Sequence, residues 1–132
     1  MKWYLASRQS RKEEVKRIIK SLEEHGQEIS YNWTGLESLH PYSENKDKSI
    51  KISGKIPHAI SSSDIFVLFS DSGGTDMFIE LGIAINNFLN HKKPKIYILG
   101  EYNSRSLMHF HHSITRVNSI EEVFEEEKLS IK

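Results

Sequence analysis

The chain lacks cysteine, an excess of charge of either sign and long hydrophobic runs, and each absence excludes a class of protein. Without cysteine there is no disulfide framework, thiolate zinc site or cysteine nucleophile. Lysine plus arginine and aspartate plus glutamate number 18 each, so no overall positive field favours a nucleic-acid polymer as partner. No apolar run approaches the ~20 residues that span a bilayer, and no export signal follows Met1. We therefore expect a cytoplasmic protein without a membrane partner.

Short apolar runs alternate with amphipathic stretches along the 132 residues. We predict strands over 3–6, 28–33, 64–69, 95–99 and 114–117, because each is a short run rich in apolar residues. Helices are expected between them, and such alternation is typical of a parallel sheet with right-handed crossovers. We therefore predict a single α/β domain over residues 1–132. Its expected architecture is a three-layer sandwich with a flavodoxin-like or Rossmann-like parallel sheet of about five strands.

Local signals predict where the helices begin and end. Ser10 with Glu13, and Ser119 with Glu122, have the spacing of a capping box, in which each side chain satisfies a free backbone N–H of the first turn. Both pairs therefore predict a helix start. Gly26 is expected to end the first of these helices, because glycine adopts the left-handed conformation that commonly follows a helix.

Residues 34–55 give a weaker signal. The segment contains Gly35, Pro41, Asn45 and many charges, without sustained periodicity. We predict a long surface connection that starts a helix late, followed by a short helix or turn over 57–63. Long loops in compact domains are often functional lids, and the alternative is a mobile insertion without a role.

The stretch 61–100 contains the most informative pattern. An apolar run at 64–69 leads into a glycine-containing loop at 71–75, and an amphipathic helix follows. The stripe expected to be buried consists of Met77, Leu81, Ala84, Ile85 and Phe88. At 100° per residue, Glu80 lies about 60° from Met77, at the edge of that stripe. A partly desolvated carboxylate there can act as a nucleophile or a base, although the helix macrodipole alone also favours glutamate in the first turns.

Four segments together carry a resemblance to a known family. They read KWYLASRQSRKEE at the start, SSDIFVLFSDSGGTDMFIELGIAI in the middle, then KKPKIYILGE and NSRSLMHFHHSITRVNSIEEVF. In these segments the chain resembles the nucleoside 2-deoxyribosyltransferase family, most closely its short, phage- and bacteria-associated branch, which is related to nucleotide N-glycosidases. The resemblance covers nearly the whole chain apart from residues 34–55.

The resemblance implies an activity. Members of that family cleave the N-glycosidic bond of nucleosides or nucleotides and pass the sugar to another base or to water. The glutamate of the ELG motif, Glu80 here, is implied as the nucleophile that attacks the anomeric carbon. A carboxylate suits this role because it forms a covalent ester and splits one difficult step into two. Tyr4 matches the strand tyrosine whose hydroxyl approaches that glutamate, and a core aromatic on a buried strand is the alternative interpretation.

The sequence departs from the family at two positions. The family usually carries an aspartate eight residues ahead of the acid that opens the strand, to protonate or hold the leaving base, and that position is Ile56. Transferases also often place an aspartate six residues before the glutamate, where this chain has Gly74. His58, Asp71 and Asp76 are local candidates for this assistance, which is typically worth ~10²–10⁴-fold. The alternative hypothesis is a nucleotide-binding or sensing protein of the same fold with weak or no catalysis.

Two loops at the carboxyl ends of predicted strands, 7–10 and 71–75, are expected to border one crevice. Ser7, Arg8 and Ser10 can bind a 5′-phosphate at the mouth of a helix, or else only cap and solvate that helix. Trp33 can stack on a base or pack against the sheet edge. The other expected contacts of a small nucleoside or nucleotide are His58, Asp71, Gly73, Gly74, Thr75 and Asp76.

Residues 101–113 are expected to form a polar, histidine-rich loop anchored by Leu107, Met108 and Phe110. The spacing of His109, His111 and His112 resembles a metal site, but relatives carry histidine at the His109 position without a metal, so we expect neither metal nor cofactor. In the family, residues of this loop reach a neighbouring subunit's pocket. The resemblance therefore implies that Asn103 and His109 act across the interface of a homodimer or higher homo-oligomer, with Phe78 and Ile79 as further contacts.

Overall fold

The computed structural model describes residues 1–131, which are built on a five-stranded sheet of order β2-β1-β3-β4-β5. The strands are β1 Lys2–Ala6, β2 Glu28–Ile29, β3 Ile65–Phe69, β4 Lys95–Leu99 and β5 Ile114–Val117. Every pairing among them is parallel. This is the flavodoxin-like order, so the predicted α/β class and strand order are confirmed.

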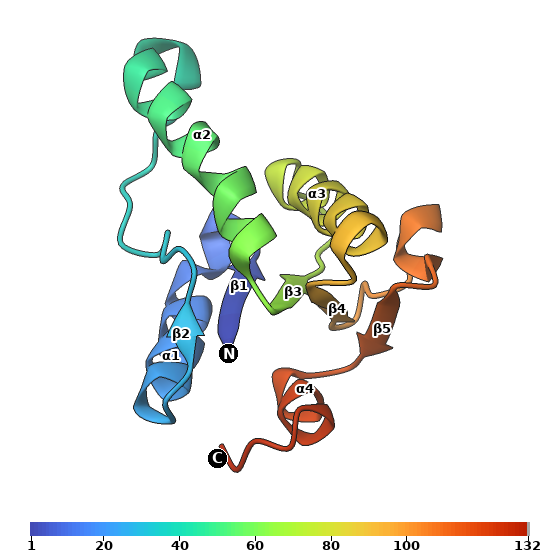
Figure 1. Cartoon of the computed structure of the whole chain (residues 1–132). Helices are drawn as coiled ribbons and strands as arrows, with labels where there is room; N and C mark the ends of the chain where they lie inside the picture. Colours follow the sequence, from blue (N-terminus) through green and yellow to red (C-terminus); the bar gives the residue numbers. More distant parts are fainter. Residues whose placement is uncertain (132) are drawn as a thin grey trace.

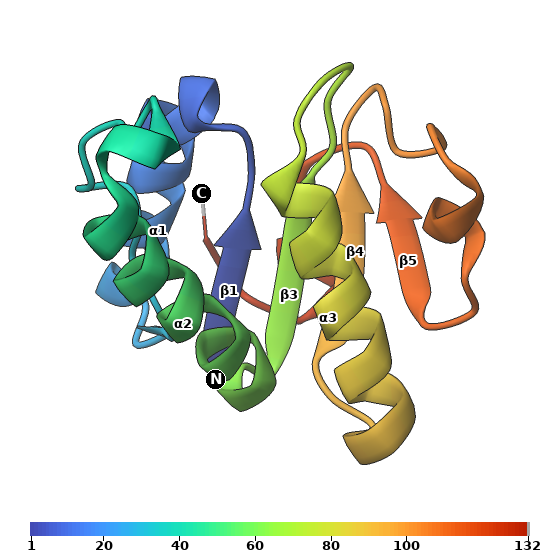
Figure 2. The same cartoon turned by 90° about the horizontal axis from the view of Figure 1, so that it is seen from above.

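Helices cover both faces of the sheet and complete a three-layer sandwich (Figures 1 and 2). They are α1 Lys12–Glu24, α2 Lys46–Ser62, α3 Asp76–His91 and α4 Ile120–Glu126. Successive side chains of a strand point to opposite faces, and β1 follows this rule. Trp3 and Leu5 belong to the core cluster with α1 and α4, whereas Tyr4 and Ala6 belong to the cluster with α2 and α3. The second face is the one on which the candidate site lies.

The structure confirms the strand predicted from the apolar run at 64–69 and the helix predicted after it. β3 is buried along its whole length, as its uninterrupted apolar run predicts for a strand covered on both faces. On α3, Met77, Leu81, Ala84 and Ile85 are buried, and Phe88 packs against them. The predicted stripe on this helix is therefore confirmed, and Glu80 lies beside it.

Strand β2 is shorter than the strand predicted over 28–33, because it pairs with β1 only at Glu28–Ile29. The chain then turns away from the sheet. The side-chain oxygen of Asn32 accepts hydrogen bonds from the backbone N–H of Thr34 at 3.0 Å and from its hydroxyl at 2.6 Å. Such local bonds from asparagine favour a turn over a strand, so the prediction was wrong for residues 30–33.

Only one of the two predicted capping boxes caps its helix. The hydroxyl of Ser119 accepts the backbone N–H of Glu122 and begins α4 as expected. Ser10 instead lies inside a short 3-10 helix, Gln9–Arg11, which precedes α1 without a side-chain cap. The pairing of Ser10 with Glu13 was therefore wrong, because the chain enters α1 through an additional turn.

Helix α2 is longer than the sequence predicts. It spans Lys46–Ser62, with Pro57 inside it, whereas the pattern indicated only a late helix start and a short helix or turn over 57–63. Its buried residues are Ala59 and Ile60, and its first turns extend beyond the sheet (Figure 1). A helix that buries only its last turns has little amphipathic periodicity, which is why the sequence signal was weak.

Candidate active site

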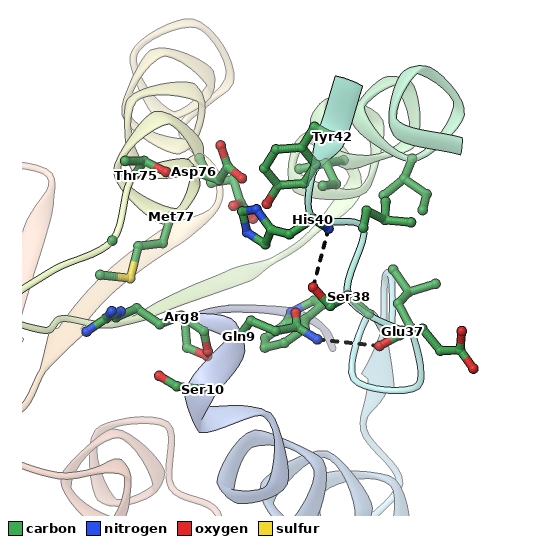
Figure 3. A pocket seen from close by; sticks show the side chains of 18 of the residues that line it. Arg8, Gln9, Ser10, Glu37, Ser38, His40, Tyr42, Thr75, Asp76 and Met77 are labelled. Carbon is green, nitrogen blue, oxygen red and sulfur yellow. Dashed lines mark hydrogen bonds between the residues drawn. The ribbon is translucent and has the colours of Figure 1, made fainter. Parts of the chain in front are cut away.

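A cavity of about 370 Å³ lies at the carboxyl ends of β1 and β3, on the face covered by α2 and α3 (Figure 3). Four segments line it. The first is β1 and the turn after it, with Tyr4, Ser7, Arg8, Gln9 and Ser10. The connection to α2 contributes Trp33, Leu36, Glu37, Ser38, Leu39, His40 and Tyr42, and α2 itself contributes Ile52 and Ile56. The loop before α3 and the first turns of that helix contribute Gly74, Thr75, Asp76, Met77 and Glu80. Ligands bind at this edge of open α/β sheets, so the cavity is the candidate active site.

Glu80 and Tyr4 meet in the wall of this cavity. The Tyr4 hydroxyl donates a hydrogen bond to the Oε1 atom of Glu80. Tyr4 is 1 % exposed, and its ring stacks on Phe66 with the centroids 5.8 Å apart and the planes at 6°. Tyr4 is therefore both a core aromatic and a fixed hydrogen-bond donor to the carboxylate, so the two interpretations of this residue coexist.

The surroundings of Glu80 place its ionisation near neutral pH. Burial raises the pKa of Glu80 to about 7, the hydrogen bond from Tyr4 opposes this, and the charge of Asp76 adds to it. Burial together with the Glu80 charge raises the pKa of Tyr4 well above its usual range, so Tyr4 remains a neutral donor. A partly desolvated carboxylate of this kind can attack an electrophilic carbon or accept a proton.

Arg8 and Asp71 form an ion pair at the mouth of the cavity, with Nη1 and Oδ1 3.5 Å apart. Partial burial acts in the opposite direction, but hydrogen bonds from Ser72 and the nearby guanidinium groups of Arg8 and Arg11 hold the pKa of Asp71 below its usual range. Asp71 is thus an ionised partner for arginine rather than a source of protons. It orients Arg8, which lines the cavity.

The two glycines of the 71–75 loop allow close packing around this ion pair. A Cβ at Gly73 would lie 3.1 Å from Nη1 of Arg8. Gly74 has φ +107°, and a Cβ there would lie 2.6 Å from Cε of Met77. Since a φ in this range is strained for residues with a side chain, an aspartate at position 74 would not fit this loop as it stands. The conformation of this loop thus favours glycine at position 74.

Trp33 is 9 % exposed, and its indole N–H donates to the carbonyl of Leu5 at 2.7 Å. It packs against the sheet edge and also lines the cavity. Ser7, Arg8 and Ser10 line the opening together, as their position after the first strand predicts.

Five predicted site residues do not line the cavity of this chain, namely Asp71 and Gly73 at its mouth, and His58, Asn103 and His109 farther away. His58 is exposed on α2 and does not line the cavity, so it is not placed to assist a leaving group there. The Asn103 amide donates to the carbonyl of Val117, the last residue of β5, at 2.7 Å. His109 is fully buried beside α3, with its ring 5.9 Å from that of Phe78.

The prediction that apolar side chains anchor the 101–113 loop was wrong. Leu107, Met108 and Phe110 are 86 %, 49 % and 57 % exposed, whereas His109 is 0 % exposed. Nε2 of His109 is 3.0 Å from the hydroxyl of Ser70, and Nδ1 is 2.6 Å from that of Ser106. Burial lowers the pKa of His109, and Arg105 and Arg116 lower it further. The buried anchor is thus a satisfied polar side chain, which hydrophobicity patterns do not detect.

Comparison with known proteins identifies the fold. No protein-family profile and no curated protein sequence matches the chain. The solved structure of the CMP N-glycosidase BcmB from Clostridium botulinum is similar, with a TM-score of 0.63 over 98 % of this chain and 100 % of that one. The two sequences are 21 % identical, so the similarity establishes a shared fold.

Within residues 1–131, no helix has the length and hydrophobicity needed to cross a membrane. In the same part of the chain, no group of three or more histidine, aspartate or glutamate side chains is arranged to hold a metal ion.

Most of the lining residues that sequence reasoning missed belong to the segment that covers the cavity; the others are Gln9, Ile52, Ile56 and Met77. Residues 36–42, here called the cover segment, contribute six of the lining side chains named above. Their location favours the interpretation of this region as a functional lid over that of an insertion without a role. Ile56 also lines the cavity, so the position of the family's aspartate faces the site and carries an aliphatic side chain instead.

Proposed function

We propose that the protein cleaves the N-glycosidic bond of a nucleoside or nucleoside 5′-monophosphate, with Glu80 as the nucleophile. The observation that carries the proposal is the Tyr4–Glu80 pair in the cavity wall, in which burial raises the pKa of Glu80 to about 7. Two further points support it. The fold is shared with a CMP N-glycosidase, and the motif around Glu80 resembles that of the nucleoside 2-deoxyribosyltransferases.

In this mechanism a carboxylate oxygen of Glu80 attacks the anomeric carbon while the bond to the base breaks and its electron pair passes to the base nitrogen. The product is a glycosyl ester on Glu80. Water, or a second base, then attacks the same carbon and releases the carboxylate. The Tyr4 hydroxyl favours the ionised form of Glu80 before attack and stabilises it again when the ester breaks.

We propose that a 5′-phosphate is bound at the opening of the cavity by Arg8, with Ser7 and Ser10 beside it. The Arg8 side chain is 42 % exposed and is held by Asp71 at one edge. The remaining donors of a guanidinium can meet phosphate oxygens in paired hydrogen bonds. This arrangement favours nucleoside monophosphates over free nucleosides.

The test is a panel of ribo- and deoxyribonucleosides and their 5′-monophosphates, incubated with and without an acceptor base. Free base and exchanged product are separated by chromatography. We expect base release from at least one monophosphate and a loss of ~10³-fold or more in Glu80→Gln, as is typical when a covalent nucleophile is removed. Glu125→Gln, an exposed glutamate of α4, is the matched control. Absence of Glu80-dependent release across the whole panel would reject the proposal.

A second candidate function is a nucleotide-binding or sensing protein with weak or no turnover. The aliphatic Ile56, which faces the cavity where relatives carry an aspartate, favours it. This hypothesis expects a nucleoside monophosphate to raise the melting temperature without production of free base. Detection of free base in the same sample would rule it out.

We also propose that two copies of the chain associate through the face formed by α3 and residues 107–110. Both elements expose large apolar side chains, namely Ile79 on α3 and Leu107, Met108 and Phe110 on the short 3-10 helix. The ring of Phe78 connects the two elements, because it lies 5.9 Å from the His109 ring. Exposed apolar clusters of this kind mark interaction surfaces.

A further inference from the structure

The direction of attack determines where a proton donor for the leaving base must lie. In a displacement at the anomeric carbon, the nucleophile approaches from one face of the sugar and the base departs from the other. Glu80 lies on α3, so it would attack the sugar from the side of that helix. Asp76, one helical turn before it, lies on that same helix, so it is on the nucleophile's side. A donor for the leaving base must therefore come from the opposite wall.

The opposite wall is formed by the cover segment and α2. Ile52 and Ile56 of α2 have no proton to donate. Figure 3 shows the carboxylate of Glu37 directed away from the cavity, whereas the His40 side chain extends into it, toward the start of α3. Among the described residues that line this wall, His40 therefore combines the required position with a side chain that can carry and donate a proton.

The contacts that position His40 come from residues close to it in the sequence. Its ring packs against that of Tyr42, with the centroids 4.2 Å apart and the planes at 47°. Its backbone N–H donates to the hydroxyl of Ser38 at 3.3 Å. The side-chain amide of Asn45 donates to the carbonyls of Leu39 and Pro41 at 3.1 Å and 3.3 Å and joins the cover segment to the start of α2. The imidazole is thus presented to the cavity with its ring nitrogens free of protein partners among the described residues.

We propose that His40 is the catalytic acid that protonates the leaving base, an inference that rests on the proposed N-glycosidase function. As the C1′–N bond breaks, its electron pair passes to the base nitrogen and the imidazolium of His40 gives that base a proton, while the Glu80–C1′ bond forms. In the second step water attacks C1′, the ester bond breaks with its electrons returning to Glu80, and one water proton restores the imidazolium. His40 thus does from the cover segment what the family's aspartate does from the position of Ile56.

The experiment compares two leaving groups in His40→Asn and His40→Gln. One substrate is the monophosphate of the panel that the wild-type protein cleaves fastest, and the other is the 4-nitrophenyl glycoside of the same sugar phosphate. Nitrophenolate departs without a proton, so only the natural base requires the acid. We compare single-turnover rates with enzyme in excess, because these report only the first step, before water attacks the ester. The rate for the natural base is expected to fall ~10²–10⁴-fold, while release of nitrophenolate changes by less than about threefold. His91→Asn, which changes an exposed histidine in the last turn of α3, is the matched control.

Three results would overturn this role, and they are distinguishable. Equal losses on both leaving groups would mean that His40 only holds the cover segment in place. Full activity of both variants on the natural base would exclude His40 while leaving the N-glycosidase function intact. Absence of Glu80-dependent cleavage by the wild-type protein would reject the proposed function itself, and the role of His40 with it.

Discussion

At the scale of single residues, Glu80 meets two opposing requirements. The proposed mechanism needs its carboxyl group in the wall of the cavity and ionised, but burial there penalises the ionised form. The balance raises the pKa of Glu80 to about 7, because the hydrogen bond from Tyr4 compensates only part of the desolvation. A carboxyl group held in this way costs folding stability whenever it is ionised.

This cost predicts a pH-dependent effect of Glu80→Gln on stability. The pKa of Glu80 is raised from its ordinary value of 4.5 to about 7 in the folded protein, so the stabilisation that comes from protonated Glu80 is complete below pH 4.5 and is lost as the pH rises through 7. Glutamine cannot ionise. Relative to wild type, Glu80→Gln should therefore gain about 2–3 kcal/mol in the free energy of unfolding between pH 5 and pH 8.

Urea denaturation of both proteins at the two pH values measures this difference. Glu125→Gln, which removes an exposed carboxylate, should show no comparable gain. A difference between wild type and Glu80→Gln that stays constant from pH 5 to pH 8 would contradict the burial of the Glu80 charge.

A second prediction at this scale concerns Tyr4→Phe. The change keeps the ring that stacks on Phe66 but removes the donor to Glu80, and that hydrogen bond lowers the pKa of Glu80. The acid limb of kcat/KM should therefore move to higher pH, and the rate at pH 7 should fall roughly tenfold for every pH unit by which the limb moves. Much of the loss should be recovered at higher pH.

The pH profile of base release measures this movement of the acid limb, and thermal melts check that the fold is retained. Tyr102→Phe, which changes an exposed tyrosine, is the control. A uniform loss at every pH would mean that Tyr4 acts on the substrate directly rather than through the ionisation of Glu80.

At the scale of elements, the short 3-10 helix Leu107–Phe110 is held to the body of the protein by its one polar buried residue. His109→Ala should destabilise the protein by about 2–4 kcal/mol, because it opens a cavity and leaves the hydroxyls of Ser70 and Ser106 without their partner. Leu107→Ala, at 86 % exposure, should change the free energy of unfolding by less than about 0.5 kcal/mol. Urea denaturation of the two variants measures both losses. A larger loss in Leu107→Ala than in His109→Ala would show that Leu107 is the anchor.

The elements that could be predicted from sequence are those that bury a periodic set of side chains. β3 and α3 do so, and their boundaries and buried faces follow from their patterns. α2 buries mainly Ala59 and Ile60, so its length was not predictable from periodicity. The same limit applies to the site. Glu80 could be placed because it flanks a buried stripe, whereas His40 lies on an exposed segment, where no local pattern reports which way a side chain points.

At the scale of the whole molecule, the charges balance and leave no long-range repulsion between copies. Lysine plus arginine and aspartate plus glutamate number 18 each. The face formed by α3 and residues 107–110 then exposes Ile79 at 64 % and Leu107 at 86 %, together with Phe110. Removal of such apolar surface from water favours association by about 25 cal/mol per Å², and electrostatics at this net charge does not oppose it.

We therefore predict that the double variant Ile79→Glu with Leu107→Glu is monomeric at concentrations at which the wild-type protein is a dimer or larger. Two carboxylates placed opposite their symmetry mates would have to be desolvated near one another, which costs several kcal/mol. Both side chains are exposed in the isolated chain, so the variant should fold normally. Sedimentation velocity over a concentration series measures the change, and Ile50→Glu, at an apolar side chain 60 % exposed on α2, is the matched control. A wild-type chain that sediments as a monomer throughout the series would refute the proposed interface, and loss of association in the Ile50→Glu control would assign it to α2 instead.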